Sequence, residues 1–112
     1  MNTIILRGRL TANPELKTSK GEKGTTTARF SLAVPDRTHR NTEDEFDVDF
    51  IRTVAYGSVA DAIGQYTFKG SEVLVIGKLH TYTIKDKAKK SINISEVVVE
   101  RIEFISGYKT SD

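Results

Sequence analysis

The fold of this chain is most constrained by residues 46–57, which read F-D-V-D-F-I-R-T-V-A-Y-G. The stretch is rich in aromatic and β-branched residues and has neither proline nor an internal glycine, so it predicts a long β-strand. Alternate residues of a strand share a face, which places Phe50, Arg52 and Tyr56 on one side. Because arginine is seldom fully buried without a partner, this side is predicted to be exposed.

Two readings of that exposed side remain open from these residues alone. Two aromatic rings flanking a guanidinium are typical of a platform on which unpaired bases stack. The alternative is that Arg52 extends its aliphatic stem from the edge of an ordinary core face and leaves its charge in solvent. The neighbouring parts of the chain are needed to choose between them.

The length of 112 residues predicts a single domain with one compact core. An apolar fraction of 38% and a charged fraction of 29% are typical of globular proteins. The chain has no cysteine, which excludes disulfides, thiolate metal sites and cysteine nucleophiles. No apolar run approaches the length of a membrane span or a signal-peptide core, so we expect a cytoplasmic protein with no membrane partner.

Charge is unevenly distributed along the chain, although the formal net charge is only +2. Residues 1–42 carry a net charge of +5 and residues 43–72 a net charge of −5. Residues 73–95 carry +4 and residues 96–112 carry −2. Segregation of this kind indicates basic patches that bind a polyanion.

Alternating apolar and polar residues predict five strands and one helix. Gly8 suggests a bulge or sharp bend in the first strand, and Pro35 is expected to end the second. The helix is expected over residues 58–69, with Ser58 as its N-cap, Asp61 as the capping partner and Gly70 as its stop signal. The five expected strands are residues 2–10, 26–34, 46–57, 71–82 and 92–105.

This order predicts an all-β domain over residues 1–106, a five-stranded OB-fold barrel with one helix between strands three and four. Residues 107–112 are expected to form a short flexible tail. Ligands of OB-folds lie across strands two and three, between the loops that follow strands one and four. Here residues 17–25 and 85–90, which form those two loops, are rich in lysine. Topology, charge and aromatic residues therefore point to one surface.

Several segments resemble the bacterial single-stranded DNA-binding protein family across nearly the whole chain. They are N-T-I-I-L-R-G-R-L-T-A-N-P-E-L-K, F-S-L-A-V, D-F-I-R-T-V-A-Y-G-S-V-A-D, K-G-S-E-V-L-V-I-G-K-L-H-T and S-E-V-V-V-E-R-I-E-F-I. The resemblance implies an OB-fold that assembles as a homotetramer, with a dimer as the alternative, and that winds single-stranded DNA around its outside. It also implies no catalytic activity, no cofactor and no metal, and a role in DNA replication, recombination and repair.

The resemblance assigns individual roles to residues that match the family pattern. Phe50 and Tyr56 match base-stacking positions, Arg52 matches a basic contact between them, and Lys69 matches a lysine beside the glycine that follows the helix. Together with the charge pattern this gives a set of expected phosphate or basic contacts. They are Arg29, Arg37, Arg40, Arg52, Lys69, Lys78, Lys85 and Lys87.

Three features depart from the family pattern. Thr38 and Ile84 stand where the family usually has aromatic residues, and Tyr82, on the same strand face as Ile84, is expected partly to replace the latter as a stacking residue. The chain ends on G-Y-K-T-S-D, whereas family members typically continue to an acidic tip that recruits replication and repair proteins. Partners that dock on such a tail are therefore not expected, as in a truncated chain or a short phage- or plasmid-encoded form.

Two other classes of function stay open at this point. OB-folds host many functions, so an RNA-binding module or a primosome-type adaptor is an alternative. Asp47 and Asp49 share a strand face and offer oxygen ligands for a divalent cation, which an enzyme would need. No histidine or third carboxylate is spaced to complete such a site, and His39 and His80 have no partner for a catalytic dyad, so no enzymatic activity is expected.

Overall fold

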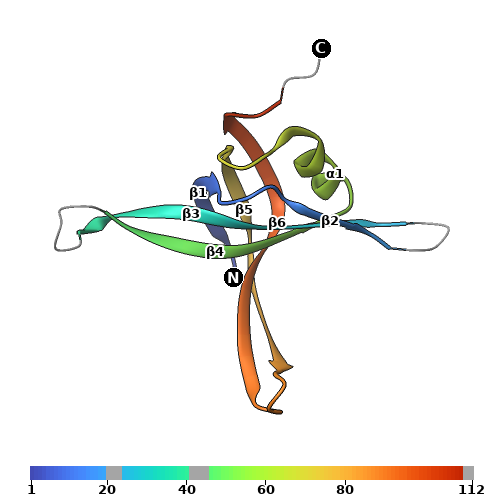
Figure 1. The fold of residues 1–112 in the computed structure, drawn as a ribbon. Helices are drawn as coiled ribbons and strands as arrows, with labels where there is room; N and C mark the ends of the chain where they lie inside the picture. The colour runs from blue at the N-terminus through green and yellow to red at the C-terminus, as the bar shows by residue number, and fades with distance from the viewer. Residues whose placement is uncertain (20–23, 41–45, 110–112) are drawn as a thin grey trace.

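The computed structural model describes residues 1–19, 24–40 and 46–109, and for residues 37–40 and 46 it describes the backbone alone. The described part contains six strands and one helix (Figure 1). They are, in chain order, β1 (Ile4–Leu10), β2 (Glu15–Thr18), β3 (Thr26–Arg40), β4 (Phe46–Tyr56), α1 (Gly57–Tyr66), β5 (Glu72–Lys85) and β6 (Ser91–Ser106).

Five of these strands form a closed ring. The strand order is β1-β5-β6-β4-β3-β2, and a further pairing joins β1 to β3 through Arg9 with Ala33 and Leu10 with Leu32. All pairings are antiparallel except that of β4 with β6, where Thr53 lies opposite Val97. With α1 between β4 and β5, the third and fourth strands of the ring, the predicted OB-fold is confirmed.

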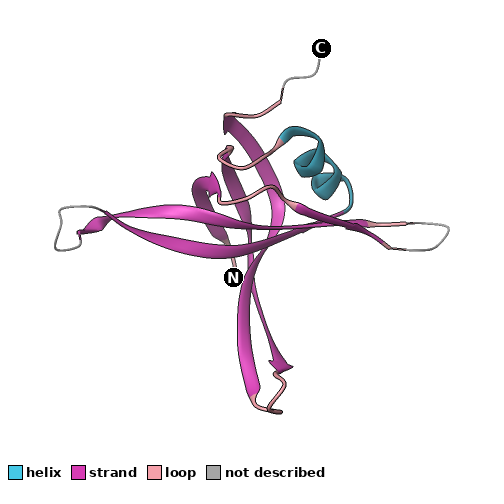
Figure 2. Ribbon diagram, viewed as in Figure 1, coloured by secondary structure: helices cyan, strands magenta, loops and turns pink. Residues whose placement is uncertain are grey.

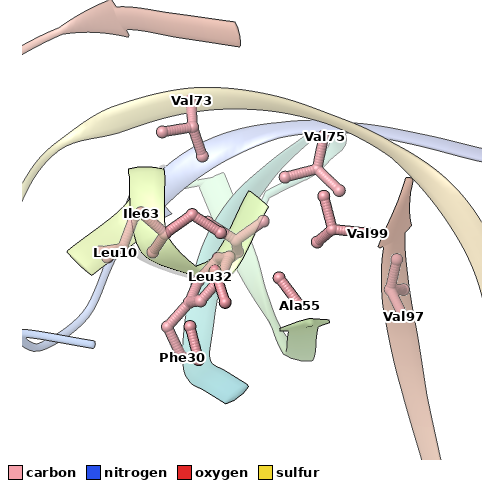
Figure 3. Packing of buried hydrophobic residues seen from close by; sticks show 11 residues of the cluster. Leu10, Phe30, Leu32, Ala55, Ile63, Val73, Val75, Val97 and Val99 are labelled. Atoms are coloured by element: carbon pink, nitrogen blue, oxygen red, sulfur yellow. The ribbon is translucent and has the colours of Figure 1, made fainter. Parts of the chain in front are cut away.

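The ring encloses a core of alternate strand residues (Figure 3). Leu32 of β3, Val73 and Val75 of β5 and Ile63 of α1 are fully buried. The helix buries Ala60 and Ile63, so it covers the ring with one apolar side. Residues between the core positions of each strand point away from the ring, and these form the outer surface considered below.

Two glycines mark places where backbones come too close for a side chain. A Cβ atom on Gly8 would lie 2.6 Å from the carbonyl oxygen of Ala33, and one on Gly77 would collide with the carbonyl oxygen of Val98. The pairing of β1 with β5 runs through Gly8 without a register shift, so β1 has no bulge toward β5 there, and the close contact with β3 accounts for the glycine. At Gly77 the register of β5 with β6 does shift, next to Ile76.

The prediction that Pro35 ends the second strand is wrong, because β3 continues to Arg40. Pro35 lies opposite Val48 of β4, while on its other side β3 pairs with β1 only at Leu32 and Ala33. Proline removes a donor, which an edge strand tolerates where that donor would face solvent. The long β3–β4 hairpin therefore extends well beyond the ring (Figure 2).

Other boundaries also differ from the prediction. Residues 17 and 18 were expected in a loop, but residues 15–18 form β2, which pairs with residues 26–29 of β3 and has only exposed side chains. Such a strand is held by backbone hydrogen bonds, so it leaves no apolar alternation in the sequence.

The helix also begins and ends earlier than predicted. It runs from Gly57 to Tyr66, so Ser58 lies inside it and no side chain caps its N-terminus. At its end the Thr67 hydroxyl and backbone N–H both donate to the carbonyl oxygen of Ile63, and the backbone becomes extended at Thr67, with φ −108° and ψ 156°, so the helix ends before Gly70.

The last described residues contact the body of the domain. The backbone N–H of Lys109 donates to the carbonyl oxygen of Tyr66, with an N–O distance of 2.8 Å. The ring of Tyr108 lies 5.9 Å from that of Phe104, which in turn lies 5.6 Å from Tyr66. These contacts join the end of β6 to α1.

The carboxylate of Glu72 in β5 links β1 to β5 and β6. Glu72 accepts hydrogen bonds from Arg7 Nε and from the Ser106 hydroxyl, both at 3.1 Å, and Arg9 Nη2 lies 3.7 Å away. The Arg7 hydrogen bond, followed by that from Ser106, lowers the pKa of Glu72 below its usual value of 4.5.

Because the pKa of Glu72 is lower in the folded state, its charged form stabilises the fold above pH 4.5, and this contribution is lost as the pH falls through the folded-state pKa. We expect the free energy of unfolding of Glu72→Gln to depend less on pH below 4.5 than that of the native sequence. Urea unfolding between pH 3 and pH 7 measures this, with Glu103→Gln as the control for an exposed carboxylate. Parallel profiles for Glu72→Gln and the native sequence would contradict the role given to Glu72.

Candidate nucleic-acid interface

The outer face of β4 is exposed at the three positions that the sequence singles out. Phe50 is 69% and Tyr56 48% exposed, and Arg52 is also exposed. Arg52 lies opposite Ser31 of β3. Thr53 and Ala55, which lie between Arg52 and Tyr56 in the sequence, are fully buried and point into the core. The predicted exposed face is thus present, and it continues onto the neighbouring strands.

Val54 is the exception on this face, because it is fully buried. It lies opposite Arg29 of β3 on one side and Val98 of β6 on the other. Arg29 Nη1 donates to Glu96 Oε2 at 3.0 Å, and these two residues belong to the strands on either side of β4. The ion pair therefore crosses β4 close to Val54, which explains how this side chain is covered.

An open groove of about 650 Å³ lies on this face. It brings together Arg29, Phe50, Arg52 and Tyr82, which come from β3, β4 and β5 and are separated by up to 53 positions in the sequence. The remaining lining residues are polar or small side chains of the β1–β2 connection and β2, together with two residues of β3. They are Thr11, Ala12, Asn13, Glu15, Phe30 and Ser31.

Tyr82 reaches the groove from the β5–β6 hairpin. It lies opposite Ile94, while His80 lies opposite Glu96 and Lys78 opposite Val98. Directly opposite residues of antiparallel strands share a face, so Lys78, His80 and Tyr82 lie on the face that carries Glu96. The rings of His80 and Tyr82 are 5.6 Å apart.

Tyr56 does not line this groove. It lies at the other end of β4, opposite Thr27 and directly before α1. Six residues of a strand separate it from Phe50, a distance of about 20 Å. The structure therefore places the two predicted stacking residues of β4 at separate points of one extended surface, with Tyr82 nearer to Phe50.

The tip of the β5–β6 hairpin presents the predicted lysines. Lys85 ends β5 opposite Ser91, and Lys87 lies in the exposed connection that follows. Asp86 Oδ1 accepts hydrogen bonds from the backbone N–H groups of Ala88 and Lys90 at 2.9 and 2.8 Å, which holds the turn. An aspartate in a short polar connection is a recognisable turn signal, so this role was open to prediction.

The other predicted cations are distributed as follows. Lys69 is exposed and its backbone N–H donates to Asn13 Oδ1 at 2.8 Å, which joins the segment after α1 to the edge of the groove. Arg37 and Arg40 lie in the β3 part of the β3–β4 hairpin, and their side chains are outside the described residues. Arg29 is not a free cation, because of its ion pair with Glu96.

Glu96 is the residue of this face that sequence reasoning missed. Only 3% of its surface is exposed, although it starts the apolar run E-V-V-V. A glutamate inside an apolar strand signals that a partner must exist, because charged side chains are rarely buried unpaired. The sequence does not indicate which arginine that partner is, since Arg29 lies 67 positions away.

The described residues offer little for the enzyme alternative. Asp47 and Asp49 are exposed on β4. Within residues 1–19, 24–40 and 46–109, no three histidine, cysteine, aspartate or glutamate residues are grouped so that they could hold a metal ion. In the same part of the chain, α1 is too short and too polar to cross a membrane.

Comparison with known proteins identifies relatives along the whole chain. Residues 1–105 match the model of the single-strand binding protein family. Single-stranded DNA-binding protein 1 of Staphylococcus aureus strain MSSA476 is 37% identical over 112 residues, which are all of this chain and 70% of the relative. The single-stranded DNA-binding protein of Fusobacterium nucleatum is 40% identical over 106 residues, covering 93% of this chain and 66% of the relative.

A solved structure gives the same answer for the fold. The structure of a Plasmodium falciparum SSB in complex with ssDNA matches this chain with a TM-score of 0.81 and 32% sequence identity, covering 95% of this chain and 96% of the other. The family model and the relatives agree with the resemblance read from the sequence segments. The chain belongs to the single-strand binding protein family.

Proposed function

We propose that this protein binds single-stranded DNA without sequence preference and protects it during replication, recombination and repair. The observation that carries this proposal is the groove that joins Phe50, Tyr82 and two arginines on the outer face of an OB-fold. Aromatic rings beside cations suit unpaired bases and their phosphates. Membership of a family of binding proteins, and not of enzymes, agrees with the expected lack of catalytic activity.

Stacking would supply the part of the affinity that requires unpaired bases. Phe50 is the most exposed aromatic residue of the groove, and Tyr82 faces the same space from β5. In duplex DNA both faces of each base are covered by neighbours, so these rings favour a single strand. A bound strand that continued along β4 would reach Tyr56 after about 20 Å, which corresponds to several nucleotides.

Positively charged side chains would supply the rest of the affinity. They lie chiefly on the two hairpins and on the segment after α1. Lys78, Lys85 and Lys87 lie along the β5–β6 hairpin, and Lys69 lies beside the groove at Asn13. Arg37 and Arg40 remain proposed contacts on the β3–β4 hairpin. Contacts of this kind release counterions from the phosphates and make binding depend on salt.

We also propose that the protein forms homo-oligomers, a tetramer in preference to a dimer, and acts in the cytoplasm. Ile5 of β1 supports the assembly, because it is 63% exposed and lies opposite the half-buried Ile76 on the outside of the ring. An apolar pair on an outer face is stabilised when a second subunit covers it.

Light scattering at micromolar concentration measures this assembly. We expect the mass of a tetramer for the native sequence, and a smaller species for Ile5→Glu, because a charge at this position opposes burial against another subunit. Leu16→Glu, at an apolar residue of β2 that is 48% exposed, serves as the control. A stable monomer for the native sequence would contradict the proposal.

Replacing Phe50 with alanine tests the stacking role. We expect the affinity for oligo-dT to fall by about 1–3 kcal/mol, because one base loses its stacking surface. Phe68→Ala is the matched control, since Phe68 is also exposed but does not line the groove. Fluorescence titration of both variants measures the difference, and equal losses would contradict the assignment of Phe50. A preference of the native protein for matched RNA or duplex DNA over oligo-dT would favour the RNA-binding or adaptor alternative.

Replacing Lys85 and Lys87 together tests the phosphate contacts. For the native sequence we expect the logarithm of the binding constant to fall linearly with the logarithm of salt concentration, with a slope of about −0.7 per phosphate contact. The double alanine variant should have a shallower slope, whereas either single substitution should change it little, because Lys89 and Lys90 lie in the same connection. Affinity that stays constant between low and moderate salt would rule out this electrostatic contribution.

A further inference from the structure

The ion pair between Arg29 and Glu96 reaches the groove through Arg29, and Glu96 is not among the residues that line it. Arg29 lines the groove, and its side chain remains 46% exposed, while that of Glu96 is 3% exposed. The bond uses Arg29 Nη1 and Glu96 Oε2 at 3.0 Å. A guanidinium has five N–H donors, so this contact leaves several of them available toward the groove.

The charge of Arg29 is already balanced before any ligand arrives. A phosphate that contacted the remaining donors of Arg29 would gain little electrostatic attraction, because a buried carboxylate 3.0 Å away already balances the guanidinium charge. Withdrawing the guanidinium would leave Glu96 buried and unpaired, which is strongly unfavourable. Arg52, two positions from Phe50 on the same face, has no ion-pair partner among the described residues and is the better phosphate contact.

We propose that Glu96 is a positioning residue that balances the charge of Arg29 and fixes its guanidinium as a hydrogen-bond donor to bases, and not to phosphates. This inference rests on the proposed binding of single-stranded DNA, and it changes the role that the sequence predicts for Arg29. The planar guanidinium lies in the groove that Phe50 and Tyr82 also line, where stacked bases would present their edges. Base edges carry acceptor atoms such as the O4 of thymine, and arginine donates readily to them.

The first experiment replaces both partners. Arg29→Gln with Glu96→Gln keeps the net charge and leaves no buried charge unpaired, so the fold is expected to persist, which thermal unfolding verifies. We expect its affinity for oligo-dT to fall about tenfold at every salt concentration, with an unchanged salt slope. Arg52→Met is the comparison, and its slope should become shallower by about 0.7, because a free cation is removed.

A second ligand separates bases from phosphates directly. An abasic oligonucleotide of the same length keeps the phosphates and lacks the edges that Arg29 would contact. We expect the native protein and the double variant to bind it equally at low salt. The proposal would be overturned if the double variant lost as much affinity for the abasic strand as for oligo-dT. A salt slope that becomes shallower by about 0.7 in the double variant would overturn it as well.

Substitution of Glu96 alone tests its positioning role. In Glu96→Gln, Arg29 becomes a free cation, so we expect a steeper salt slope together with weaker discrimination between oligo-dT and the abasic strand. A purely structural role would change neither the slope nor this discrimination. Glu103→Gln removes an equal charge from an exposed position on β6, about 23 Å from Glu96 along the strand, and should leave both unchanged.

Arg29→Lys gives a readout that does not depend on the double variant folding. It retains the charge opposite Glu96 and removes the planar fork, so affinity for oligo-dT should fall while the salt slope stays the same. Native affinity in this variant would overturn the inference. Failure of the native protein to bind oligo-dT would instead contradict the proposed function, which keeps the two failures distinct.

Discussion

The architecture depends on a short contact, the closure of the ring where β1 meets β3. Only two residue pairs make it, Arg9 with Ala33 and Leu10 with Leu32, and it requires the backbones to approach so closely that position 8 has no room for a side chain. Closure gives every strand of the ring an inside and an outside. The inside buries Leu10, Leu32 and their neighbours, and the outside of β4 is left exposed beside β3 and β6. The binding surface is therefore a consequence of how the core closes.

Much of this arrangement could be predicted because it leaves a local pattern. Alternation of apolar and polar residues along β3 and β4 indicates both strands and the face on which Phe50 and Arg52 lie. The elements that could not be predicted are held by backbone hydrogen bonds, which leave no pattern of apolar and polar side chains in the sequence. The four exposed residues of β2 and the continuation of β3 through Pro35 are of this kind. The N-terminus of α1 was placed at Ser58 because serine is a common cap, but no side chain caps this helix.

The candidate site also has features that could be predicted from the sequence and features that could not. Exposure of Phe50, Arg52 and Tyr56 could be predicted from the arginine within one strand, although the choice between a stacking platform and a core edge needed the neighbouring loops. Which residues meet across strands depends on register and closure, and these depend on the whole fold. Tyr82 and Arg29 join Phe50 in the groove, whereas Tyr56 lies apart from it. Glu96 turns Arg29 from an apparent free cation into half of an ion pair, a change that only the three-dimensional structure reveals.

Pro35 has a consequence beyond the length of β3. Past Ala33 the outer edge of this strand pairs with no other strand among the described residues, so it is open to pairing with a strand of another molecule. Unprotected edges of this kind promote intermolecular β-sheet growth and aggregation. A proline deletes one donor from that edge, and the exposed Asp47 and Asp49 on the partner strand add like charges that repel a second copy. The same residue that fails to end the strand thus helps keep a long, exposed hairpin from seeding aggregates.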